Sequence, residues 1–158
     1  MYERVLVPLD GSDLAEAVLE HVTPIAERFG SEIVLLQVVS SFGEIVGQTM
    51  PRESFPSPTL QDISVEAAQQ QYEAEQAGAS TYLERVADGL RARGLKVTTE
   101  VREGPAPAAV ILAVSLDLGC DLIAMSTHGR SGIQRTVFGS VTDDVLRNSP
   151  LPLLLIRG

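Results

Sequence analysis

Four short stretches of the chain are nearly continuous in apolar residues, and a fifth alternates between apolar and polar positions. Continuous apolar runs are typical of strands that are buried on both faces of a sheet. These runs are residues 5–9, 32–39, 121–125 and 151–156. The alternating stretch, residues 97–101, has the pattern of an outer strand with one exposed face. Pro8 has no N–H to donate, so strand pairing should stop there on one side.

The segments between these strands carry apolar residues at helical spacing. In the first segment they step by four, four, three and four positions from Leu14 to Phe29. This stripe predicts an amphipathic helix over about residues 13–29, which Gly30 ends and Pro24 kinks. Similar stripes predict three further helices. They cover about residues 68–90, 107–118 and 139–148.

The segment between the second predicted strand and the second predicted helix shows no hydrophobic periodicity. Between Ser40 and Leu60 the chain is interrupted by Pro51, Pro56 and Pro58. Unstructured connections of this length are uncommon in compact domains and are often functional. We therefore expect residues 40–60 to form a mobile loop that a bound ligand orders.

Strands and helices alternate along the whole chain, which indicates an α/β fold. Apolar strands covered on both faces favour a single doubly wound parallel five-stranded sheet with helices on both faces. Right-handed crossovers give the strand order 3-2-1-4-5 that we expect for such a sheet. The chain shows no tandem repeat and no compositional break, so we expect one domain over residues 1–158.

Composition narrows the range of partners and compartments. The 158 residues include 12 Lys and Arg against 21 Asp and Glu, a net charge of −9. That charge repels nucleic acid and anionic lipid, so neither is an expected partner. No apolar run reaches the roughly 18 residues of a membrane span, and a cytoplasmic protein is predicted. The single cysteine, Cys120, forms no internal disulfide and is expected to be an inert core thiol.

Residues that could do chemistry follow the first and fourth predicted strands. In open α/β sheets, ligands bind at the carboxyl ends of the strands, where the strand order reverses. The first strand is followed by Asp10-Gly11-Ser12, and the fourth by a segment with three glycines, several hydroxyl side chains and two arginines before a helix. Glycines let backbone N–H groups turn toward a phosphate. The segment is neither a Walker A loop nor a Gly-x-Gly-x-x-Gly motif, so an ordinary glycine-rich connection is equally compatible with it.

Three segments of the chain are similar to segments of one known protein family. The chain resembles a universal stress protein domain over essentially its whole length, through Val5-Leu-Val-Pro-Leu-Asp-Gly-Ser12, the helix opening at Gly104 and the segment from Asp121 to Gly132. The ATP-binding branch of that family has the motif Gly-x2-Gly-x9-Gly-Ser/Thr. Gly129 and Gly139-Ser140 match it, whereas Ser126 replaces the first glycine. Serine is small and keeps its backbone N–H, so it can take the place of this glycine.

The resemblance implies a nucleotide-binding site for ATP with Mg²⁺ or Mn²⁺. It places Asp10 near the ribose and the metal, Val38 beside the adenine, and the glycine-rich loop around the phosphates. The candidate nucleotide-binding residues are Pro8, Leu9, Asp10, Val38, Met125, Ser126, His128, Gly129, Arg130, Gly139, Ser140, Val141 and Thr142. Asp10 is also the candidate metal ligand, and Arg135 is a further possible phosphate contact.

Structural roles explain several of these residues equally well. Asp10 could cap a turn, Ser12 or Asp13 could cap the first helix, and Ser140 could cap the last. Met125 would be a packing residue. His128 has no predicted partner that would make it a general base, so orienting the loop is the simpler role.

The predicted function is an ATP-binding regulatory module that acts as a homodimer. A slow ATPase or autokinase using the same site is the alternative, and a nucleotide-free dimeric scaffold is a third possibility because of Ser126. A phosphoacceptor receiver domain is disfavoured, since Arg102-Glu103-Gly104 follows the third strand in place of an acceptor aspartate. The final strand has no following helix pattern, and an outer strand leaves unpaired N–H and C=O groups, so we expect two copies to pair through it.

Overall fold

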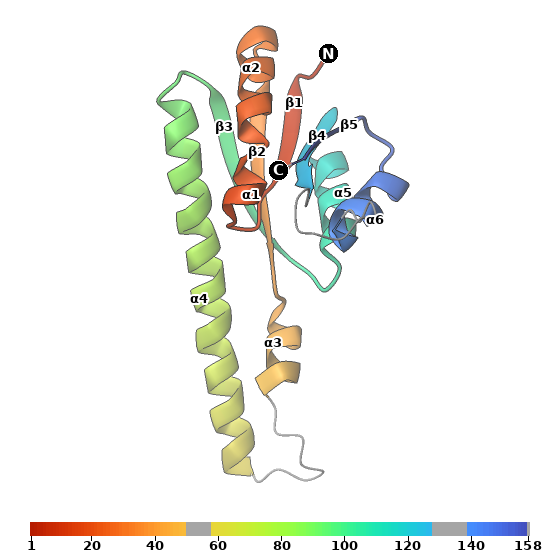
Figure 1. Ribbon diagram of the computed structural model, residues 1–158. Coiled ribbons are helices and arrows are strands. Elements are labelled where there is room, and N and C mark those ends of the chain that lie inside the picture. The colour runs from red at the N-terminus through yellow and green to blue at the C-terminus, as the bar shows by residue number, and fades with distance from the viewer. Residues whose placement is uncertain (50–57, 128–138, 158) are drawn as a thin grey trace.

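Five parallel strands form one sheet at the centre of the protein. The computed structural model describes residues 1–49, 58–127 and 139–157, with side chains from 64 onward in the second range. The strands are β1 (Arg4–Pro8), β2 (Glu32–Val39), β3 (Lys96–Glu103), β4 (Leu122–Thr127) and β5 (Leu153–Arg157). Their order is β3-β2-β1-β4-β5 and every pair is parallel (Figure 1). The predicted fold class and strand order are confirmed.

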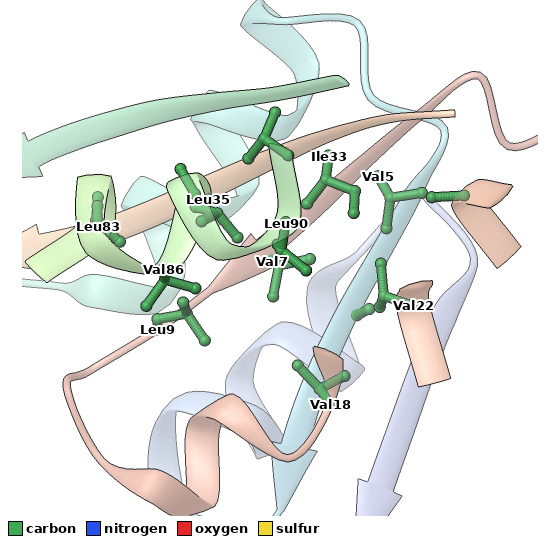
Figure 2. Packing of buried hydrophobic residues seen from close by; sticks show 14 of the residues in the cluster. Val5, Val7, Leu9, Val18, Val22, Ile33, Leu35, Leu83, Val86 and Leu90 are labelled. Atoms are coloured by element: carbon green, nitrogen blue, oxygen red, sulfur yellow. The ribbon is translucent and has the colours of Figure 1, made fainter. Parts of the chain in front are cut away.

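Helices cover both faces of this sheet. They are α1 (Asp13–Glu16), α2 (Leu19–Phe29), α3 (Phe42–Thr49), α4 (Pro58–Arg91), α5 (Pro107–Asp117) and α6 (Ser140–Asn148). Side chains alternate along β1, so Val5 and Val7 enter one core cluster and Leu6 enters the other. The first cluster lies under α2 and α4, as Figure 2 shows, and the second lies under α5 and α6. Each fully buried valine or leucine stabilises the fold by about 1.5–3 kcal/mol.

The predicted helix over residues 13–29 is divided into two helices. Ala17 and Val18 keep helical φ values but have ψ near −26°, and the N–H of His21 bonds the carbonyl of Val18 at 3.0 Å. This tighter 3₁₀-like turn separates α1 from α2. Pro24 lies inside α2, so the helix continues through it, and the expected kink at this position stays a prediction. Gly30 ends α2 with a φ of 71°, as expected.

The prediction of an unstructured loop over residues 40–60 is wrong where the structure describes it. Residues 42–49 form α3, and α4 begins at Pro58. Ser41 and Glu44 make a capping box, since the Ser41 N–H donates to Glu44 Oε2 at 2.8 Å and the Glu44 N–H donates to Ser41 Oγ at 3.4 Å. The remaining part of that prediction, residues 50–57, lies outside the described residues.

A pair of helices projects beyond the carboxyl edge of the sheet. Figure 1 shows α3 lying beside the first half of α4 there. Ile45 and Ala68 are fully buried, and the rings of Phe42 and Tyr72 meet edge to face with centroids 5.9 Å apart. These apolar contacts explain why residues 42–49 fold although their periodicity is short. No helix within the described ranges combines the length and hydropathy needed to cross a membrane.

Candidate functional site

The hydrogen-bonded pairing between β1 and β4 ends before the carboxyl ends of the two strands. β1 pairs with β4 only through Val5↔Leu122 and Leu6↔Ile123. In contrast, β1 continues with β2 as far as Pro8, and β4 continues with β5 as far as Thr127. The sheet is therefore unpaired between β1 and β4 at the point where the strand order reverses, which is where open α/β sheets bind ligands.

Pro8 explains why the pairing stops. The N–H of Leu9 donates to the carbonyl of Leu36 at 2.8 Å, so Leu9 bonds toward β2. Hydrogen-bonding direction alternates along a strand, and the nitrogen of Pro8 therefore faces β4. Proline has no N–H for that side, so the ladder between β1 and β4 cannot extend past it. The expectation that pairing stops at Pro8 on one side is confirmed.

A tight turn after β1 holds Asp10 at the surface. Gly11 has a φ of 86°, which favours glycine. Asp10 Oδ1 accepts from the N–H of Ser12 at 3.0 Å and from its hydroxyl at 2.6 Å. Ser12 Oγ in turn accepts from the Ala15 N–H at 3.1 Å, which makes Ser12, rather than Asp13, the N-cap of α1. Asp10 thus has a structural role through one carboxylate oxygen, and it remains exposed.

The start of α6 has backbone donors without partners inside the helix. Gly139 is the N-cap, and a glycine has no side chain with which to cap the first turn. Ser140 is the first helical residue and is exposed, so the alternative that its side chain is the N-cap of the helix does not hold. The first intrahelical bond runs from Asp143 N–H to the Gly139 carbonyl at 2.9 Å. The N–H groups of residues 139–142 therefore have no partner within the helix.

The acidic side chain in the first turn of α6 bonds along the helix and not back to these N–H groups. Asp143 Oδ2 accepts from Arg147 Nε at 2.7 Å, one turn further along α6. Val141 packs against the core cluster that contains Met125 of β4. The first turn of α6 therefore lies on the face of the sheet that this cluster covers, and its dipole and N–H groups favour an anion.

The other candidate residues are distributed over both faces of the sheet. Val38 and Val141 are half-buried and pack against the cluster that includes Met125, which is itself buried. Leu9 is buried in the opposite cluster, beside Val86 (Figure 2). The buried side chains of Leu9 and Met125 are core residues, which leaves their backbone for any contact with a ligand.

Three further candidates complete the described part of the set. Pro8 is half-buried at the end of β1, and Thr142 is buried on α6. Ser126 is half-buried and its hydroxyl donates to the Ala15 carbonyl over 3.5 Å, a long bond that links β4 to α1. His128, Gly129 and Arg130 lie outside the described residues, as does Arg135. Cys120 is buried, and burial raises the pKa of its thiol to about 11, in agreement with an inert core role.

A group of polar side chains between α1 and α4 was not predicted from the sequence. Arg85 of α4 pairs with Glu16 of α1 at 2.9 Å, and its guanidinium lies 5.3 Å from the ring centroid of Tyr82. The Tyr82 hydroxyl is buried and has no hydrogen-bond partner among the described residues. Burial raises its pKa, and the Glu16 carboxylate raises it further. Nothing in the sequence indicates that α4 meets α1, so no local signal identifies this group.

The donor set fits a cation that arrives with its own oxygen ligands. Within the described ranges, no three His, Cys, Asp or Glu side chains come together as a metal site. Asp10 provides one exposed carboxylate. Mg²⁺ and Mn²⁺ prefer oxygen ligands, and Mg²⁺ is commonly held by one or two carboxylates together with substrate phosphates. Asp10 and the N–H groups of α6 that have no intrahelical partner therefore suit a metal–phosphate ligand better than a metal ion alone.

Comparison with known proteins identifies the family. The sequence matches the model of the universal stress protein family over residues 1–157. Universal stress proteins MJ0531 and MJ0577 of Methanocaldococcus jannaschii are 28% identical over 157 residues and 26% identical over 162 residues. Each match covers 99% of this chain, with 83% of MJ0531 and 96% of MJ0577.

Solved structures agree with this match. The structure of MJ0577 has a TM-score of 0.74 at 27% identity, covering 100% of this chain and 97% of that one. A universal stress protein in complex with cAMP has the same fold, with a TM-score of 0.66 at 20% identity over 99% of this chain and 97% of that one. Since the family match spans nearly every residue and the sheet has the same architecture, the chain belongs to the universal stress protein family.

Proposed function

We propose that this universal stress protein binds ATP together with Mg²⁺ or Mn²⁺ and acts as a cytoplasmic regulatory homodimer. The observation that carries the proposal is the start of α6, where the N–H groups of residues 139–142 lack intrahelical partners and the N-cap, Gly139, has no side chain to cap them. Val141 in this turn packs on the same face of the sheet as Met125, and the ladder between β1 and β4 is open toward the carboxyl ends of these strands, which supports a ligand between the two. A protein of net charge −9 has no general attraction for anions, so a local set of donors is the feature that favours phosphate.

The remaining candidate residues take their roles from this arrangement. The phosphates would contact the N–H groups of Gly139, Ser140, Val141 and Thr142. Asp10 would hold the ribose and the cation, and Val38 would lie beside the adenine. Pro8, Leu9, Met125, Ser126, His128, Gly129 and Arg130 would line the rest of the site. A related universal stress protein bound to cAMP supports an adenine nucleotide as the ligand class.

A binding experiment with the purified protein tests this function. We expect calorimetry with MgATP to give saturable one-to-one binding, and mass spectrometry to identify an adenine nucleotide released from the protein by denaturation. Absence of MgATP binding at millimolar nucleotide would contradict the proposal. Steady hydrolysis or a phosphorylated chain in the same samples would instead assign the slow ATPase or autokinase function.

The proposed dimer uses the outer edge of β5. This strand has β4 as its neighbour on one side, and Leu153–Ile156 are half-buried. The N–H of Ile123 bonds the Pro152 carbonyl at 3.1 Å. With the register Ile123↔Leu153, the N–H of Leu154 faces β4 and that of Leu155 faces outward. Two copies related by a two-fold axis can pair these outward groups.

Proline substitution distinguishes the two sides of β5. We expect Leu155→Pro to convert the dimer into a folded monomer in sedimentation velocity, because it removes an outward donor and leaves the pairing with β4 intact. Leu154→Pro is the control, since it removes an inward donor and should destabilise the sheet itself. A wild-type protein that sediments as a monomer at micromolar concentration would refute the dimer.

A further inference from the structure

Helix α5 is apolar around its whole circumference but is buried on one side only. From Pro107 to Leu116 it contains no charged residue, and its one charged residue, Asp117, is its last. Ile111 and Val114 are buried against the sheet, whereas Leu116 is 57% exposed. A helix that is apolar on all sides is ordinarily covered on all sides. The uncovered side of α5 is therefore a candidate contact surface.

Four residues at helical spacing form this uncovered side, and small and large side chains alternate along it. We call it the outer face of α5, and its members are Ala109, Leu112, Ala113 and Leu116. Leu112 is half-buried and the other three are exposed. In contrast, α2, α4 and α6 each present acidic side chains to solvent, such as Glu20, Glu66 and Asp144. In a chain of net charge −9, the outer face of α5 is thus a surface that a second copy can approach with little repulsion.

The order of these side chains makes the outer face complementary to itself. Two α5 helices can pack antiparallel about a two-fold axis that passes between the positions of Leu112 and Ala113. Leu116 of one copy then lies against Ala109 of the second copy, and Leu112 lies against Ala113 in the same way. Each large side chain meets a small one, and every contact occurs twice, as an isologous interface requires.

The charges at the two ends of α5 favour the same antiparallel arrangement. Asp117 is exposed and makes no ion pair within the described part of the chain. At the other end, the N-cap Ala106 has no capping side chain, and the first intrahelical bond runs from the Val110 N–H to the Ala106 carbonyl at 3.1 Å. The two-fold axis brings Asp117 of one copy to the N–H of Ala108 of the second copy, at the positive end of the helix dipole. Parallel packing would instead bring the two Asp117 carboxylates together.

We propose that the outer face of α5 is a self-association surface, on which a second copy of this chain packs its own α5 antiparallel about a two-fold axis. This surface is separate from the edge of β5 and does not depend on a bound nucleotide. An eleven-residue helix is about 16 Å long, so the contact buries less than the roughly 1,200 Å² of a stable interface. The association is therefore weak, and it joins copies at about 0.1 to 1 mM chain, well above the micromolar range.

Sedimentation equilibrium from about 10 μM to 1 mM chain tests this surface, in about 0.15 M salt to screen the charge of the copies. The average mass of the wild type should rise over this range. Ala113→Glu places two like charges beside the axis, so we expect its dissociation constant to be at least about tenfold higher. Ala113 is exposed on a helix, where glutamate is well tolerated, and the melting temperature should not change. Ala77→Glu makes the same change at an exposed position of α4 and should associate as the wild type does.

A mixture of two variants tests the two-fold pairing itself. Ala113→Lys alone should also lose the association, and an equimolar mixture with Ala113→Glu should regain it, because opposite charges then meet at the axis. A mixture that stays unassociated would overturn the pairing of α5 with its own copy. A wild type of constant mass up to 1 mM would overturn the inference and leave the outer face to a different partner, and wild-type association of Ala113→Glu would overturn it as well. The mass at micromolar concentration reports separately on the dimer through β5.

Discussion

The amino and carboxyl edges of the sheet differ in how far their polar groups are hydrogen-bonded. At the amino edge, Arg4 donates through Nε and Nη2 to Glu32 at 2.9 and 2.8 Å and through Nη1 to the Leu118 carbonyl. Thr98 donates to the other oxygen of Glu32 at 3.2 Å. This one network joins β1, β2, β3 and the end of α5, and its charged groups bond each other.

Asp121 completes the pairing at the amino edge. Its two oxygens accept from the N–H groups of Glu3 and Arg4 at 3.0 and 3.1 Å. Its own N–H donates to the Arg4 carbonyl at 2.9 Å, which ties the start of β4 to β1. Satisfied buried and half-buried polar groups contribute to stability and have little capacity left for a ligand.

The carboxyl edge has the opposite character. There the ladder between β1 and β4 is open, and the N-cap of α6 is a glycine without a capping side chain. Among the described residues, the Tyr82 hydroxyl has no acceptor within hydrogen-bond geometry, and Asp10 bonds only within its own turn. Unmet hydrogen-bonding capacity, more than the presence of charge, therefore separates a candidate binding edge from a structural one. Substitutions at the carboxyl edge should change affinity, and those at the amino edge should change stability.

The largest expected effect is the loss of nucleotide binding in Gly139→Val. A branched side chain at the N-cap would occupy the space through which phosphate approaches the N–H groups of α6, so MgATP affinity should fall at least about a hundredfold. Gly139 has φ −55° and ψ 149°, which any residue adopts, and the melting temperature should stay near the wild-type value. Calorimetry and thermal denaturation measure the two quantities.

Ser140→Ala is the matched control for that variant. It removes a hydroxyl that does not cap α6 and keeps every N–H group, so a loss of no more than a few-fold is expected. If Gly139→Val binds MgATP with wild-type affinity, the phosphates do not lie at the start of α6.

A smaller effect is expected when Asp10 is changed. Asp10→Asn removes the charge but keeps an oxygen for the Ser12 N–H, so MgATP affinity should fall about tenfold with almost no change in stability. Asp10→Ala should lose the same affinity and, in addition, about 0.5–1 kcal/mol of unfolding free energy, because the turn loses its acceptor. Calorimetry and urea denaturation separate these effects. Equal affinities of wild type and Asp10→Asn would assign Asp10 to the turn alone.

The sequence predicted the fold well because its strands are short, apolar and separated by strong turn signals. The nearly continuous apolar run of residues 32–39 and the alternation of residues 97–101 correspond to an inner and an outer strand in the structure. α3 was missed although Ser41-x-x-Glu44 is a capping-box pattern, since its apolar stripe is too short to show a period. The tighter turn at Ala17 and Val18 leaves the apolar spacing unchanged and therefore has no signature in the sequence.

The candidate site was predictable in part for a similar reason. Asp10 and Gly139 directly follow predicted elements, so topology alone brings them to the carboxyl edge. The role of Ser140 was not predictable, because a serine at a helix start serves equally as N-cap or first residue, and the choice depends on one dihedral pair. Tyr82 could not be found at all, since its position beside Glu16 depends on the packing of α4 against α1, about 66 residues apart in sequence.

The smallest expected effect is a pH-dependent loss of stability in Asp121→Asn. Burial would raise the pKa of Asp121, but hydrogen bonds from the N–H groups of Glu3, Arg4 and Tyr2 and the charge of the N-terminal amine lower it below its ordinary value of 3.8. Asparagine replaces one acceptor oxygen with a donor facing an N–H, so the variant should unfold with about 1 kcal/mol less free energy at pH 7.

The sign of the pH dependence follows from the lowered pKa. An acid whose pKa is lower in the folded state stabilises the protein above its unfolded pKa, and this contribution is lost as the pH falls through the folded value. The difference in unfolding free energy between wild type and Asp121→Asn should therefore be constant from pH 7 to about pH 5 and shrink below pH 3.8. Urea denaturation across this range measures it, with MgATP affinity at pH 7 expected to be unchanged. A difference that persists undiminished in acid would mean that the carboxylate charge of Asp121 does not stabilise the amino edge, and a changed affinity would mean that the two edges are not independent.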